Sequence, residues 1–307
     1  MNRVATGNNY SSVLGDLLRA QVRQAEANAQ VSSGKTASDL KGFAKQAETL
    51  LATRSIQTKV DGFLTQGKIL TSRLESQDLA LNQTADAARG ARQAIAEALA
   101  TGRGEALMSE LSSWFSSAAD SLNAKFGGRY LFAGGQVDSP PVTADSMADL
   151  TTQPTVAAFF NNDNLVPTNQ LDESTTIQSG FLADQLGGDL FDAFRQVQDY
   201  VDVNGTFTGQ LSAAQTTFLQ GMLDDFDAAG VGLTDAAARN GLTQNRVDKT
   251  MATQTDRQSM LEGMVGGITD VDMAQAISRL QQAQTTVQAS AQVFSTLSQS
   301  SLLELLR

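Results

Sequence analysis

One stretch of this chain keeps an uninterrupted three-four spacing of mostly apolar or small residues, and this spacing limits the fold more than any other feature. Its members are Val60, Phe63, Gly67, Leu70, Leu74, Gln77, Leu81, Thr84, Ala88, Ala91, Ile95 and Ala98. Such a spacing places one stripe along a single α-helix, and at 1.5 Å per residue that helix is about 60 Å long. A helix of this length is a rod, so the sequence predicts an elongated helical protein rather than a compact enzyme.

The prolines divide the chain, because all four lie in one window that begins at Pro140 and ends at Pro167. The proline-free stretches on either side suit long helices, which an internal proline would break. We expect helices at about residues 8–33, 50–100, 104–125, 189–204, 212–229, 235–264 and 268–307. Gly263, Gly266 and Gly267 are expected to form a hinge before the last of them.

The middle of the chain has a different pattern. Residues 127–135 are a short β-prone run between glycine pairs, which predicts a strand or a hairpin arm. Residues 136–185 contain the prolines and many Thr, Asn and Asp residues, so we expect a β-rich or irregular insertion there. The predicted fold class is mainly α: a long antiparallel helical rod with terminal coiled-coil helices and a small β-rich insertion.

The last forty residues show a heptad repeat. Met273, Leu280, Val287 and Phe294 recur every seventh residue, with Ala276, Ala283, Ser290 and Leu297 three positions on. Thr269 and Asp270 are N-cap candidates. The helix needs a partner, either in its own chain or in a neighbour, because periodicity does not distinguish the two. The predicted subunit interface consists of Leu14, Leu18, Val22, Leu280, Val287, Phe294, Leu297, Leu302, Leu303, Leu305 and Leu306.

Composition excludes several functional classes. The chain has no Cys and no His, so disulfides, thiolate or imidazole catalysis and the usual zinc sites are excluded. Its net charge of −11 argues against binding nucleic acid. No apolar run reaches membrane-spanning length, and the first residues lack the apolar core of a secretory signal. We therefore expect a protein that is cytoplasmic or exported without such a signal.

Two patterns resemble binding sites. Residues 29–36 fit a loose phosphate-loop pattern that ends in Gly34-Lys35-Thr36, but a helix rather than a strand is expected before it. A helix end and turn is the preferred interpretation. Asp224, Asp225 and Asp227 lack the spacing of a calcium loop, so a solvated helix face is expected. The sequence predicts no enzyme activity and no catalytic, cofactor or metal site.

Both ends of the chain carry family-like motifs. Gln30-Val31-Ser32-Ser33-Gly34-Lys35 closes the first helix, and Leu302-Leu303-Glu304-Leu305-Leu306-Arg307 ends the chain. These motifs resemble those of the flagellin superfamily. Residues 128–134, which read GRYLFAG, and residues 270–277, which read DVDMAQAI, are more similar to the hook–filament junction proteins of that superfamily. The resemblance covers about the first 135 and the last 120 residues, but residues 37–41 depart from the usual motif, which leaves a filament flagellin open.

The resemblance implies a fold and a role. Residues 1–45 with 265–307 would form an inner coiled-coil domain, residues 46–135 with 186–264 a helical rod, and residues 136–185 an outer insertion. The subunit would be exported without a cleaved signal peptide through the flagellar type III channel and assemble outside the cell in a ring-like helical layer. Its expected partners are copies of itself, the hook-side junction protein, flagellin and an export chaperone. Alternatives are a filament flagellin, a nucleotide-binding protein that uses Gly34-Lys35-Thr36, and a cytoplasmic coiled-coil adaptor.

Overall fold

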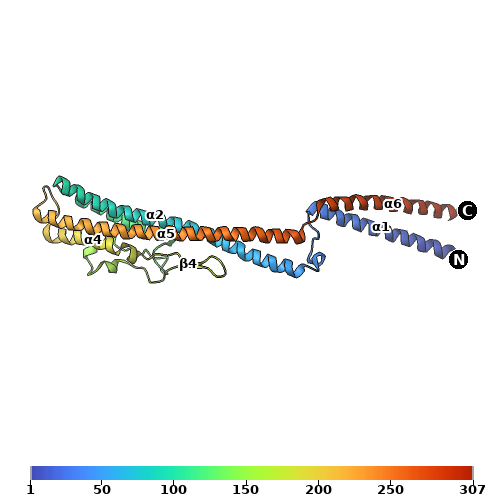
Figure 1. Ribbon diagram of the computed structural model, residues 1–307, viewed down its shortest axis with the longest axis horizontal. Helices are drawn as coiled ribbons and strands as arrows, with labels where there is room; N and C mark the ends of the chain where they lie inside the picture. The colour runs from blue at the N-terminus through green and yellow to red at the C-terminus, as the bar shows by residue number, and fades with distance from the viewer. Residues whose placement is uncertain (1, 306–307) are drawn as a thin grey trace. The chain divides into compact units, whose positions relative to one another are not determined.

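A computed structural model describes residues 2–305, with the surroundings of the side chains given for residues 11–297. Long helices account for most of this range (Figure 1): α1 (Asn2–Ser33), α2 (Ala47–Thr101), α3 (Leu107–Leu122), α4 (Ala183–Asn204), α5 (Ala213–Thr269) and α6 (Met273–Leu305). The predicted mainly-α fold is confirmed. Of the positions that keep the three-four spacing from Val60 to Ala98, all but Phe63 are buried.

The chain forms two compact units. One contains the residues up to Lys59 together with those from Arg257 onward, and the other spans Val60–Asp256. The finer division into an inner domain, a rod and an outer insertion stays a prediction.

In the first unit, α1 and α6 lie side by side, and α1 begins where α6 ends (Figure 1). Gly34 ends α1 with a φ of 68° and donates its N–H to the Gln30 carbonyl at 2.9 Å, so the predicted helix end is confirmed. A short 3-10 helix, η1 (Leu40–Phe43), follows and is capped by the Asp39 side chain. Asp272 caps α6 by accepting hydrogen bonds from the N–H groups of Ala274 and Gln275.

Three expectations about the C-terminal helices were wrong. Residues 212–229 and 235–264 are not separate helices, because α5 runs unbroken from Ala213 to Thr269. A glycine inside a helix costs only about 1 kcal/mol, and burial of Ala229, Leu233 and Ala236 offsets the cost of the nearby glycines. The predicted glycine hinge is also helical, since the break lies after Thr269. Finally, Thr269 and Asp270 do not cap α6, because Asp272 does.

The second unit has its main core where α2, α3, α4 and α5 pack together. Helix α2 contributes mostly alanines, which let large side chains from the other helices approach closely. The ring of Phe115 in α3 lies 5.0 Å from Phe191 and 5.5 Å from Phe194, both in α4, and Phe194 lies 5.0 Å from Phe226 in α5. These aromatic contacts join three helices around the alanine face of the fourth.

The segment between α3 and α4, which includes the expected insertion of residues 136–185, contains two small hairpins and two 3-10 helices. Strands β1 (Lys125–Phe126) and β2 (Arg129–Tyr130) pair across Gly127-Gly128, whose positive φ values suit a tight hairpin turn. The strand is shorter than the expected residues 127–135, because Leu131, Phe132 and Ala133 leave the ladder and are buried in the protein. After η2 (Met147–Thr151) and η3 (Val156–Phe159), β3 (Thr168–Gln170) pairs with β4 (Thr176–Gln178).

Candidate assembly surface

The contact between α1 and α6 is a heptad seam with small side chains. Among the side chains that the structure describes, only alanines are buried in it, namely Ala20, Ala27 and Ala276. The larger seam residues are half-buried: Val13, Leu17 and Val31 on α1, and Leu280, Val287, Phe294 and Leu297 on α6. A two-helix pair can cover only one stripe of each helix, so the seam alone provides little buried apolar area.

A second apolar stripe on α1 faces away from the seam. Leu14, Leu18 and Val22 are 37 %, 53 % and 57 % exposed. On α6, Met273, Ile277 and Val293 are also exposed. Unpartnered apolar side chains repeated along one helix are typical of a surface that another molecule covers.

The structure separates the residues predicted for a subunit interface into two groups. Leu280, Val287, Phe294 and Leu297 lie in the seam with α1 of the same chain, whereas Leu14, Leu18 and Val22 lie outside it. The side chains of Leu302, Leu303, Leu305 and Leu306 lie outside the described residues. Ile277 and Val293, which are also exposed, were not among the predicted residues, although their apolar character off the heptad repeat is visible in the sequence.

A backbone clasp joins the end of α1 to the link between α5 and α6. Thr36 donates its N–H to the Thr269 carbonyl at 2.7 Å, and Val271 donates to Gly34 at 3.0 Å. The Lys35 ammonium donates to Asp270 Oδ1 at 2.5 Å and to Thr269 Oγ1 at 3.3 Å. The hydrogen bond from Lys35, followed by that from the Thr269 hydroxyl, holds the pKa of Asp270 below its usual value.

This clasp uses the residues that resembled a phosphate loop. The N–H of Lys35 meets the Ser33 hydroxyl at 3.2 Å, and the N–H of Thr36 is bonded to Thr269. Helix α1 precedes Gly34-Lys35-Thr36, where a phosphate loop has a strand. These groups are therefore arranged to close a turn rather than to cradle phosphate.

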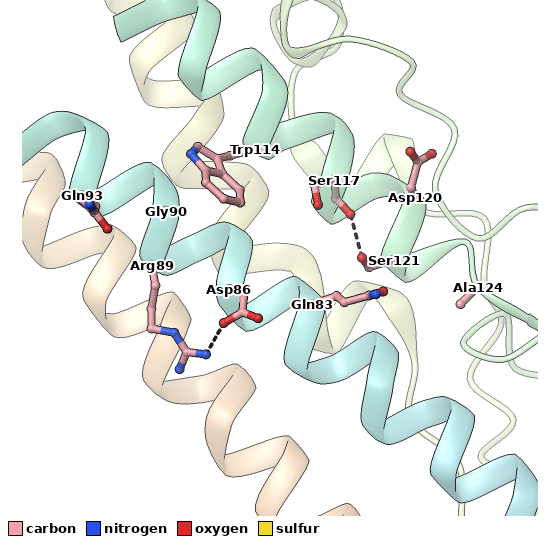
Figure 2. A pocket seen from close by; sticks show the side chains of 10 residues that line it. All are labelled: Gln83, Asp86, Arg89, Gly90, Gln93, Trp114, Ser117, Asp120, Ser121 and Ala124. Atoms are coloured by element: carbon pink, nitrogen blue, oxygen red, sulfur yellow. Dashed lines mark hydrogen bonds and ion pairs between the residues drawn. The ribbon is translucent and has the colours of Figure 1, made fainter.

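An open groove of about 770 Å³ lies between α2 and α3 (Figure 2). Trp114 lies directly against Gly90, where an added Cβ would come within 2.3 Å of the indole. The rest of the lining is polar or small, and Asp86 and Arg89 form an ion pair. Figure 2 shows the Ser117 and Asp120 side chains along the same groove. The Ser121 hydroxyl donates to the Ser117 carbonyl of its own helix at 2.7 Å rather than to a carboxylate base.

The acidic residues that resembled a calcium site are on the surface of α5. Asp224, Asp225 and Asp227 are exposed, and Asp227 pairs with Arg92 at 3.1 Å. Within the described part of the chain, His, Cys, Asp and Glu side chains nowhere gather in threes around a potential metal position. None of the helices in that part is both long and apolar enough to span a membrane.

Comparisons with known proteins agree with the C-terminal motifs. Residues 223–306 match the family described as the bacterial flagellin C-terminal helical region. A solved structure from Vibrio parahaemolyticus, assigned as a flagellar hook-associated protein, aligns with a TM-score of 0.59 at 15 % identity and covers 73 % of this chain and 97 % of that one. FlgL of Bacillus cereus aligns with a TM-score of 0.54 at 14 % identity, over 71 % and 99 %. No curated protein matches the chain.

Proposed function

We propose that this chain is a self-assembling structural subunit of the bacterial flagellum that joins the hook to the filament, and the match of residues 223–306 to the flagellin C-terminal helical region supports this. The fold agrees with this role, since two flagellar proteins described as hook-associated or FlgL share it. The role requires no catalysis and no cofactor.

The observation that carries the proposal is the exposed stripe of Leu14, Leu18 and Val22 on α1. Within one chain, the contact between α1 and α6 buries little apolar area, and both helices expose further apolar side chains. Burying an apolar side chain of this size contributes about 1.5–3 kcal/mol, so repeated contacts between copies would add substantial stability. We propose that a neighbouring subunit covers this stripe. The seam of Leu280, Val287, Phe294 and Leu297 with α1 holds the stripe in its orientation.

The proposed partners follow from a position at the junction. They are copies of this chain in a ring-like layer, a hook-side junction protein, flagellin, and a chaperone that escorts the subunit before export. The proposed location is the flagellum outside the cell, reached by type III export without a cleaved signal peptide. The alternative, a filament flagellin, uses the same surface for a different layer.

A deletion strain tests the proposal and separates the two roles. If the chain acts at the junction, cells that lack it should make hooks and release flagellin into the medium, because the filament has no attachment. If the chain is a filament flagellin, the medium should contain no flagellin after the deletion. Intact filaments in the deletion strain would contradict both roles.

A further inference from the structure

Beyond the aromatic core, the contact between α2 and α5 in the Val60–Asp256 unit includes buried polar side chains. Gln77 and Asn240 are fully buried, and Gln254 is nearly so. Asn240 donates its side-chain N–H to the Leu74 carbonyl at 2.9 Å. Neither amide atom of Gln77 has a hydrogen-bond partner among the described residues. A buried amide without a partner is destabilising, so this part of the two-helix contact is weak.

The apolar cluster at this level includes residues from outside the two helices. Leu70 and Leu74 of α2 meet Val247 of α5, with Met251 at the edge. The other buried members are Leu171 and Ile177, from the β3–β4 hairpin. The hairpin therefore completes a core that the helices alone leave open.

The hairpin is built to present those two side chains. Ile177 is buried between the exposed residues Thr176 and Gln178, so the alternation of the strand directs it to the helices. At the turn, Asp172 Oδ1 accepts hydrogen bonds from the N–H groups of Ser174 and Thr175 at 2.7 and 2.6 Å. Both ends of the hairpin are thus fixed, since at its base Ser179 donates its N–H to the Pro167 carbonyl at 3.0 Å.

We infer that the β3–β4 hairpin is a strap that holds α2 and α5 together beyond the aromatic core, and that releasing it opens this segment locally. The four-helix core does not depend on it, because Phe115, Phe191 and Phe194 pack without any strap residue. Local opening with retention of a separate core is how partly independent cooperative units behave. This inference does not rest on the proposed flagellar role.

Hydrogen exchange of the full chain carrying Ile177→Ser tests the strap. Amide protection of residues 60–80 and 240–256 should fall by about tenfold or more, while that of residues 107–122 and 190–197 stays within about twofold. Leu171→Ala, a milder change directly after strand β3, should give the same pattern with a smaller loss. Leu165→Ser is the matched control, because Leu165 belongs to the same insertion but is 62 % exposed.

Fluorescence of Trp114, the only tryptophan, reports whether the four-helix core persists in each variant. If the hairpin is a strap, we expect an unchanged Trp114 emission spectrum for Ile177→Ser, Leu171→Ala and Leu165→Ser. Unchanged protection of residues 60–80 in both strap variants would overturn the inference. Equal loss of protection in the four-helix core, or a red-shifted Trp114 spectrum in both strap variants, would also overturn it, because the hairpin would then belong to one undivided core.

Discussion

The Lys35 ammonium lies 2.5 Å from the Asp270 carboxylate, although 235 positions separate the two residues in the sequence. The pair is reinforced by the two backbone hydrogen bonds of the clasp, from Thr36 to Thr269 and from Val271 to Gly34. The end of α1 is thereby tied to the start of α6. The clasp fixes the register of the heptad contact, because it determines which turns of α1 and α6 pack against each other.

Replacing Lys35 should have little effect, because both charged groups are about half exposed and water screens such pairs. Lys35→Ala should keep the thermal midpoint close to that of the wild type and preserve motility, since the backbone bonds of the clasp remain. Calorimetric titration with ATP should show no binding to either protein. Binding by the wild type that Lys35→Ala abolishes would contradict the assignment of these residues to a turn.

The clasp should also weaken in acid. The hydrogen bond from Lys35 lowers the pKa of folded Asp270 below the unfolded value of about 3.9. A lowered folded-state pKa stabilises the protein above the unfolded pKa, and this contribution is lost as the pH falls through the folded pKa. Asp270→Asn weakens the hydrogen bonds from both Lys35 and Thr269, so it should be slightly less stable than the wild type near neutral pH, and the small difference in thermal midpoint should shrink below about pH 4. A difference that does not depend on pH would contradict this.

Gly90 should tolerate no side chain. An added Cβ would lie 2.3 Å from the Trp114 indole (Figure 2), so Gly90→Ala should destabilise the protein by about 1–3 kcal/mol in chemical denaturation and shift the Trp114 emission. Gly62→Ala is the control in the same helix, because nothing lies within 4 Å of its added Cβ. It should stabilise by up to about 1 kcal/mol. Equal effects of the two changes would refute the close packing of Trp114.

The helix α2 was predictable because its spacing is regular and its stripe is long. The unbroken α5 was not, since Gly230 and Gly232 look like a break in the sequence, whereas Leu233 is buried in the core that α5 shares with α2, α3 and α4. Helix stability in proteins comes mostly from such tertiary packing, which a single sequence does not display.

The partners of the stripes were harder to predict than the stripes themselves. The heptad of Leu280, Val287 and Phe294 was visible, but only the structure pairs it with α1 of the same chain. The contact of Leu171 and Ile177 with α2 and α5 could not be predicted. The strands β3 and β4 are short and mostly polar, so the sequence does not indicate which helices the hairpin packs against.

Val287→Asp should separate α1 from α6. The seam would then hold a carboxylate at a half-buried position, which costs free energy unless water reaches it. Circular dichroism should show lost helix, while Trp114 fluorescence in the other unit remains unchanged and filaments fail to attach. Gln281→Glu adds charge at an exposed position of α6 and should be nearly silent. Complete unfolding of Val287→Asp would show that the two units share one core.

Protease should attack the terminal helices first. The seam between α1 and α6 fully buries only alanines among its described residues, whereas the Val60–Asp256 unit has an aromatic core. Limited digestion of the monomer should remove residues 1–40 and 268–307 and leave a fragment of about residues 45–265. Mass spectrometry of the fragments checks this. Terminal helices that resist the protease as well as the Val60–Asp256 unit does would contradict it.

The most direct test of the proposed assembly surface is Leu18→Asp. Leu18 is 53 % exposed and lies outside the seam, so the monomer should keep its helix content and thermal midpoint, while complemented deletion cells should fail to attach filaments and should release flagellin. Ser12→Asp adds the same charge at an exposed position of α1 outside the Leu14, Leu18 and Val22 stripe, and it should support normal filaments. Stable filaments on cells that carry only Leu18→Asp would contradict the account.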